Sequence, residues 1–133
     1  MLRRRLLLLG PLAAITASAD QRTEILEVIE PLAAALSESR SDDFMSVFSA
    51  DVPGRADLQR HISALIAFAE VTSSIEILRA ESGRADLDWY MEIRARATGS
   101  VVERRRGTVT IRVSQKKVRE LKPVEFFRVP AIA

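Results

Sequence analysis

The sequence predicts an α+β fold in which three N-terminal helices pack on one face of a curved, cone-like antiparallel sheet of about four strands. Up to Glu70, apolar residues recur at spacings of three and four, which is typical of one buried helix face. After Glu70, apolar and polar residues alternate, as in a strand with one buried face. Short turns separate the alternating stretches, and two of the three contain glycine. The length that remains after an N-terminal leader fits a single domain.

The first 19 residues are predicted to be a cleavable signal peptide. Arg3 to Arg5 precede an apolar stretch from Leu6 to Ala14, and small residues then suit cleavage before Asp20. The arginines followed by leucines also resemble a twin-arginine export signal. An uncleaved membrane anchor is the alternative, but the apolar stretch is shorter than the roughly 20 residues that span a bilayer.

The mature domain, residues 20–133, is expected to be exported to the periplasm or the extracellular space, with no stable membrane span. Loss of three arginines with residues 1–19 changes the formal net charge from +2 to −1. Residues 20–83 carry a net charge of −7 and residues 84–133 a net charge of +6. Aromatic residues are scarce and an acidic half lies near the basic one, so nucleic acid is not an expected partner. With no cysteine and one histidine, the sequence predicts no metal site, no cofactor and no disulfide.

The first helix of the mature domain is expected within Asp20–Ser39. Pro31 lies inside its apolar pattern and has no backbone N–H to donate, which predicts either a kink or a helix that begins near this residue. The expected buried stripe consists of Ile25, Ile29, Leu32 and Leu36.

Two further helices are expected before the sheet. Ser41 or Asp42 is predicted to cap the first of them, because short polar side chains accept hydrogen bonds from the first turn. The second is predicted over Ala56–Ala69, with Asp57 near its start. The apolar side chains expected to face the core are Phe44, Met45, Val47 and Phe48 in one helix and Leu58, Ile62, Leu65, Ile66 and Ala69 in the other.

Four strands are predicted over Val71–Glu81, Asp86–Ala97, Val101–Ser114 and Val118–Val129. Pro123 lies within the last of these and indicates a bulge or an edge position. The second strand alternates most cleanly, so one of its faces should be buried and the other wet. Its expected buried residues are Leu87, Trp89, Met91, Ile93 and Ala95, and its expected outward residues include Asp86, Asp88 and Tyr90.

The element order resembles the nuclear transport factor two-like superfamily, the cone-shaped fold of ketosteroid isomerases and polyketide cyclases. Three segments carry the resemblance: Asp86–Arg94, Glu103–Arg106 and Leu121–Phe127. None of them is a catalytic signature, and this chain has Val118 where members of the superfamily often carry tryptophan. The resemblance covers about residues 25–130. It implies a mostly apolar cavity between the helices and the concave face of the sheet.

That implied cavity supplies the candidate ligand-binding residues. Its lining would consist of Trp89, Met91, Phe44, Phe48 and His61. The alternative interpretation is an ordinary core, which large apolar side chains at these spacings form far more often than they form a binding pocket.

Three polar residues are candidates for chemistry or binding. His61, the only histidine, lies at the border of a buried helix face and could act as a general base, although a structural histidine is the alternative. Glu103 and Arg105 share the phase of Val109 and are expected either to face inward as an ion pair or to form a rim salt bridge of little energetic weight.

Three hypotheses about function follow from these observations. The leading hypothesis is an exported, non-catalytic domain that binds a small apolar molecule or a protein partner and forms a homodimer through the outer sheet face near Tyr90. The alternative is an isomerase, cyclase or dehydratase acting on a cyclic apolar substrate, with His61 as base and Trp89 as a pocket wall. The sequence lacks the usual hydrolase, nucleotide-binding and metalloprotease motifs. An accessory role in the cell envelope is a third hypothesis.

Overall fold

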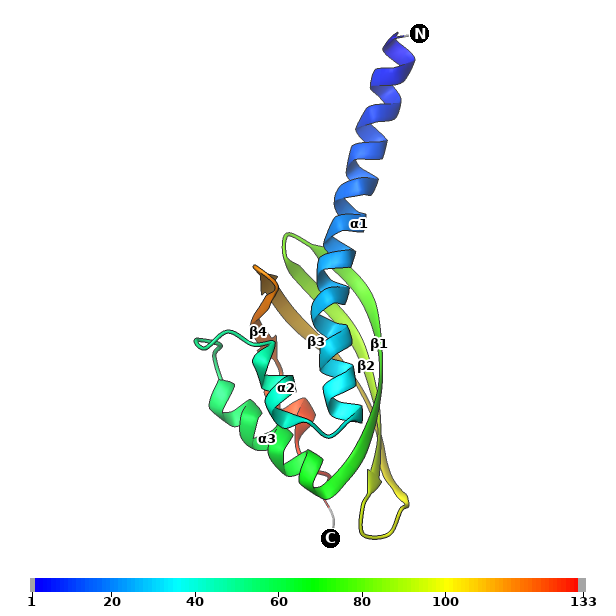
Figure 1. Ribbon diagram of the computed structural model, residues 1–133. Coiled ribbons are helices and arrows are strands. Elements are labelled where there is room, and N and C mark those ends of the chain that lie inside the picture. The colour runs from blue at the N-terminus through cyan, green and yellow to red at the C-terminus, as the bar shows by residue number, and fades with distance from the viewer. Residues whose placement is uncertain (1, 132–133) are drawn as a thin grey trace.

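The computed structural model describes residues 2–131, with side chains from Asp20 onward, and confirms the predicted α+β fold. Three helices precede a four-stranded antiparallel sheet, and a short 3-10 helix follows it (Figure 1). The elements are α1 (Leu2–Ser37), α2 (Ser41–Ser46), α3 (Arg55–Phe68), β1 (Ala69–Glu81), β2 (Arg84–Ala95), β3 (Val101–Ser114), β4 (Lys117–Lys122) and the 3-10 helix η1 (Val124–Phe127).

The sheet has the strand order β1-β2-β3-β4, so every strand pairs with its neighbours along the chain. In Figure 1 the long strands bend around the helices, and the second half of α1 lies across their concave face. Trp89 on β2 lies opposite Ile75 on β1 and Gly107 on β3. The register shifts between Ile77 and Arg79 on β1, an irregularity of the kind that bends a strand.

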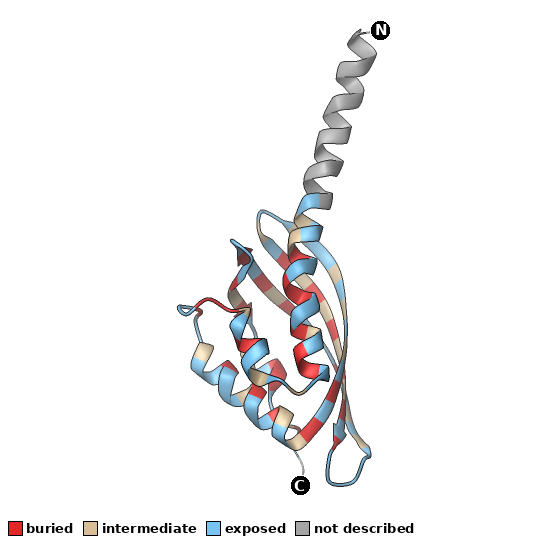
Figure 2. Ribbon diagram, in the orientation of Figure 1, coloured by how far each residue is buried: buried red, intermediate tan, exposed pale blue. Residues whose placement is uncertain are grey.

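The predicted alternation on β2 is confirmed, and β1 departs from it. The inward side chains of β2 are buried while those between them are half-buried or exposed (Figure 2). On β1, by contrast, the inward side chains after Val71 are only half-buried, namely Ser73, Ile75 and Ile77. The concave face is therefore fully covered at its centre and incompletely covered along β1.

The first helix runs without interruption through Pro31, so the predicted beginning near this residue is wrong. The proline ring is on the exposed side of α1, where water can satisfy the carbonyl that loses its N–H partner. The opposite side carries the predicted stripe, and all four residues are buried: Ile25, Ile29, Leu32 and Leu36.

The predicted cap of α2 is wrong, because neither Ser41 nor Asp42 caps the helix. Arg40 is the N-cap residue and makes no side-chain capping bond. Its carbonyl accepts the N–H of Phe44 at 3.1 Å, and its guanidinium lies 3.2 Å from the Asp43 carboxylate. The acidic residues fall inside the first turn instead, where they favour the positive end of the helix dipole.

The third helix is confirmed to within one residue at each end. Leu58, Ile62 and Leu65 form its fully buried stripe, and Ile66 is partly buried against the same core. Asp57 lies in the first turn and pairs with Arg60 one turn later.

The predicted final strand is wrong beyond Lys122. β4 is an edge strand, as Pro123 indicated, and its ladder ends before this proline, which has no N–H to donate. The chain then forms η1, which buries both Phe126 and Phe127. The alternation was unclear here because this segment is not a strand.

The predicted signal peptide, residues 1–19, lies outside the side chains that the structure describes. Within the described residues, no helix combines the length and the apolar character needed to cross a bilayer.

Candidate functional site

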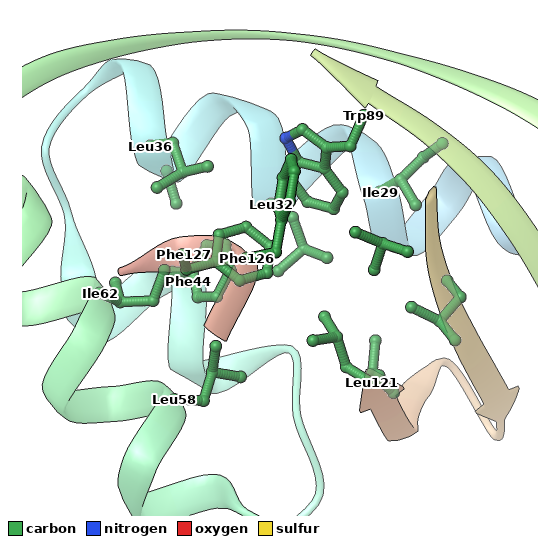
Figure 3. Packing of buried hydrophobic residues seen from close by; sticks show 14 of the residues in the cluster. Ile29, Leu32, Leu36, Phe44, Leu58, Ile62, Trp89, Leu121, Phe126 and Phe127 are labelled. Carbon is green, nitrogen blue, oxygen red and sulfur yellow. The ribbon is translucent and has the colours of Figure 1, made fainter. Parts of the chain in front are cut away.

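The concave face of the sheet is centred on Trp89, the residue around which a pocket was predicted. Its ring is fully buried, and its indole N–H donates a hydrogen bond to the Ser73 hydroxyl at 3.1 Å. Phe127 stands edge-on to the ring, with centroids 5.0 Å apart, and Phe126 lies at 6.3 Å (Figure 3). Such edge-to-face contacts are favourable and leave little free space between the rings.

Gly107 explains how Phe126 reaches this position. Gly107 faces Trp89 across β2 and β3, and a Cβ atom placed on it would lie 3.0 Å from the Phe126 ring. The absence of a side chain on β3 therefore admits the phenyl ring beside the indole. Sequence reasoning missed this role of η1. The available signal was the pair of phenylalanines after Pro123, where alternation fails.

The structure brings the four predicted apolar lining residues into one continuous core. Trp89, Met91, Phe44 and Phe48 are all buried members of a single hydrophobic cluster. The Phe44 ring is tilted against Phe48 at 5.5 Å and stands edge-on to Phe127 at 5.7 Å, both measured between centroids. Their contact with a ligand remains a prediction, and the contacts that the structure gives them are with one another.

His61 is half-buried on α3, beside the fully buried Ile62. No hydrogen bond or ion pair joins the imidazole to another residue in the described part of the chain. A general base is normally held in one tautomer and orientation by a second group. The described residues provide no such group for His61.

Among the residues whose side chains the structure describes, Arg105 is the one buried charged residue, with a side chain only 6% exposed. Its Nε and Nη2 atoms donate to the two carboxylate oxygens of Glu103 at 2.7 and 3.1 Å. Its Nη1 donates to the backbone carbonyls of Phe126 and Arg128 at 2.6 and 2.7 Å. The predicted ion pair is present, with Arg105 buried and Glu103 29% exposed, and its energetic weight stays a prediction.

The hydrogen bonds of Arg105 define its role in the fold. Four of the five guanidinium N–H donors are directed at Glu103 and at the backbone on either side of Phe127. This geometry ties the C-terminal segment to β3 and so holds the two phenylalanines against Trp89. The same donors would have to be released before the guanidinium could bind a ligand.

The pKa of Glu103 is lowered from its ordinary value, chiefly by the hydrogen bonds from Arg105, with partial burial opposing the shift. A carboxyl whose pKa is lower in the folded state stabilises the fold above its unfolded pKa. That stabilisation is lost as the pH falls below the unfolded value and through the lower folded value.

We therefore expect the stability of the protein to fall in acid partly through Glu103. The free energy of unfolding, measured with urea, should differ less between pH 7 and pH 3 in Glu103→Gln than in the wild type, because the amide does not titrate. Glu120→Gln, which alters the 3.8 Å ion pair between the half-buried Glu120 and the exposed Lys122, is the control and should keep the wild-type difference. An unchanged pH dependence in Glu103→Gln would contradict this assignment.

Ion pairs between side chains of β2 and β3 lie on the outer face of the sheet. Arg104 lies 3.5 Å from Glu92, and Arg106 lies 3.4 Å from Asp88 and above the Tyr90 ring at 5.6 Å from its centroid. The predicted outward direction of the β2 aspartates agrees with these partners, since the Asp86 carboxylate accepts the Thr110 hydroxyl at 2.8 Å. Tyr90 is thus held at the middle of this face by Arg106.

Comparison with known proteins connects this architecture to one fold. No family model matches the chain, and no curated protein matches it in sequence. The similar solved structures include a Δ5-3-ketosteroid isomerase from Mycobacterium sp., with a TM-score of 0.59 and 13% identity over 74% of this chain and 89% of that chain. An uncharacterized cystatin fold protein from Novosphingobium aromaticivorans has a TM-score of 0.59 and 14% identity over 72% and 93%.

A computationally designed 17-OHP binder is similar to the same extent, with a TM-score of 0.59 and 14% identity over 72% of this chain and 86% of that chain. At such identities the likeness concerns the fold and carries no information on activity. Helices packed on a bent four-stranded meander, together with these neighbours, identify the architecture: the chain has the nuclear transport factor two-like fold.

Proposed function

We propose that this protein is an exported, non-catalytic domain that binds a protein partner through its surface and forms a homodimer through the outer face of its sheet. The observation that supports this proposal best is the aromatic filling of the concave face, where Phe127 lies 5.0 Å from Trp89. Pockets for small molecules typically enclose several hundred Å³ of free space. A small apolar ligand would have to displace η1, which Arg105 ties to β3.

The isomerase, cyclase or dehydratase hypothesis has less support. Its proposed base, His61, makes no hydrogen bond or ion pair with the other described residues, and its proposed pocket wall, Trp89, is covered by phenylalanines. The likeness to a ketosteroid isomerase is one of fold only.

The dimer is supported by the character of the outer sheet face. Tyr90 is half-buried at its middle and covered on one side by Arg106, and tyrosine and arginine are both enriched in protein interfaces. We expect the purified protein to scatter light as a dimer at micromolar concentration. Tyr90→Glu should convert it to a monomer, because the dimer would place the new carboxylates of the two copies in the same interface. Gln59→Glu, on the exposed side of α3, should remain dimeric. A monomeric wild type at that concentration would refute the dimer.

Export is the part of the proposal that concerns residues 1–19. We expect protein recovered from the periplasm or the medium to begin at Asp20, as read by intact mass. Ala19→Arg should block this cleavage, since signal peptidase accepts small residues next to the cut. Recovery of the intact chain from the cytoplasm would contradict export.

A further inference from the structure

The two edges of the sheet are protected differently. On the β4 side, the N–H of Ser49 donates to the carbonyl of Val118 at 3.0 Å, and the N–H of Val118 donates to the carbonyl of Val47 at 2.9 Å. The segment Val47–Ser49 after α2 thus forms a parallel bridge with β4 at Val118. On the other side, the Ala69 N–H donates to the Leu65 carbonyl at the end of α3, and no other backbone hydrogen bond joins β1 to a described residue outside β2. The rest of β1, from Glu70 to Glu81, therefore presents an open edge.

An apolar groove runs beside this open edge. It lies between α1 and β1 and is lined by Leu26, Ile29, Glu30, Ala33 and Ile75. Leu26 is 41% exposed and is one of three large apolar side chains that stand out on the described surface, together with Leu78 on β1 and Val102 on β3. Two of these three belong to the elements that form the groove. The half-buried Ile75 provides its floor from the strand side.

The exposed charges beside the groove are mostly acidic. Glu27 and Glu30 are exposed on α1, and Glu76, which alternates with the inward Ile75, is exposed on the outer face of β1. Arg22 on α1 and Arg79 on β1 are the exposed basic residues of the same two segments. None of the three glutamates forms an ion pair with another described residue. Open backbone groups, an apolar groove and unpaired negative charge thus coincide along one edge.

These features indicate which kind of polypeptide segment could bind along the open edge of β1. An added strand would satisfy the free N–H and carbonyl groups of β1, and every second side chain of that strand would point toward the groove. The carboxylates would favour lysine or arginine at the alternating positions. A second copy of this chain placing its own β1 there would bring the same glutamates together, so charge opposes that arrangement.

We propose that β1 is a docking edge for a partner protein, which adds an extended segment with alternating apolar and basic residues as a fifth strand. This inference rests on the proposed function, because it names the site and the chemistry of the partner. It is independent of the dimer, which uses the outer face of the sheet.

The experiment uses a defined probe on the purified protein. The probe is an acetylated and amidated peptide of about eight residues in which valine and lysine alternate. At a probe concentration about ten times its Kd, exchange of the open-edge amides of β1 should slow about tenfold. The same peptide methylated on alternate backbone nitrogens should not bind, since it cannot complete the ladder. A valine–glutamate peptide should not bind either.

A matched pair of variants tests the groove. Leu26→Ser should weaken probe binding about fivefold, because one wall of the groove is lost. Val102→Ser removes an equally exposed side chain from β3 and should bind as the wild type does. The melting temperatures of both variants report whether the fold is intact. Absence of β1 protection with every probe, or protection centred on Tyr90 and the outer face, would overturn the docking edge. The light-scattering result for the dimer would remain valid in either case.

Discussion

Replacing Arg105 with methionine is expected to lower the free energy of unfolding by about 3 kcal/mol. Methionine fills a similar volume but donates no hydrogen bond, so the carbonyls of Phe126 and Arg128 lose a buried partner. Glu103 is left with its charge, although its side chain is 29% exposed and so retains some water. Chemical denaturation followed by tryptophan fluorescence measures the loss directly, because Trp89 lies against η1.

The neighbouring Arg104 gives a matched control. Its guanidinium is 63% exposed and pairs with Glu92 at 3.5 Å on the outer face. Arg104→Met should change the free energy of unfolding by less than about 0.5 kcal/mol. The loss in free energy of unfolding for Arg105→Lys should lie between those of the two methionine variants. The ammonium group keeps the positive charge but cannot donate to all four oxygen atoms that the planar guanidinium reaches. Equal effects of the two methionine variants would show that Arg105 does not tie η1 to β3.

Local pattern predicted most of the helices and strands but not the C-terminal segment that packs on Trp89. The alternation around Trp89 predicted a buried strand, and the spacing from Leu58 to Leu65 predicted a buried helix face, because each pattern depends only on neighbours in the chain. The phase argument also placed Glu103 and Arg105 together, since residues two apart share one face of a strand.

The C-terminal segment could not be predicted in this way. What places Phe126 is the missing side chain of Gly107, 19 residues earlier, and what holds it is the buried guanidinium of Arg105. Both are contacts between segments far apart in the sequence, and no periodicity encodes them. Pro123 indicated that the last strand is irregular, but it did not indicate that the chain turns inward after it. The inward turn of η1 places two phenyl rings beside Trp89, where the resemblance implied a cavity.

Phe127 is the residue on which the choice between a filled core and a pocket depends most directly. It is fully buried and makes edge-to-face contacts with Trp89, Phe44 and Phe126, at centroid distances of 5.0, 5.7 and 5.3 Å. Phe127→Ala should therefore lower the free energy of unfolding by about 3–5 kcal/mol, measured by urea titration. Phe127→Leu, which keeps most of the volume, should lose about 1 kcal/mol and guards against a variant that does not fold.

The cavity left by Phe127→Ala provides a second readout that a merely weakened fold would not show. An apolar cavity of this kind stays dry and accepts a small aromatic molecule, so benzene should raise the melting temperature of Phe127→Ala. It should leave the wild type unchanged, because Phe127 already occupies that space. Phe68→Ala, which truncates a half-buried aromatic residue at the end of α3, should be destabilised less and should not respond to benzene. If benzene stabilised the wild type as much as Phe127→Ala, the concave face would already hold an accessible pocket, and a small apolar ligand would replace the protein partner as the better-supported function.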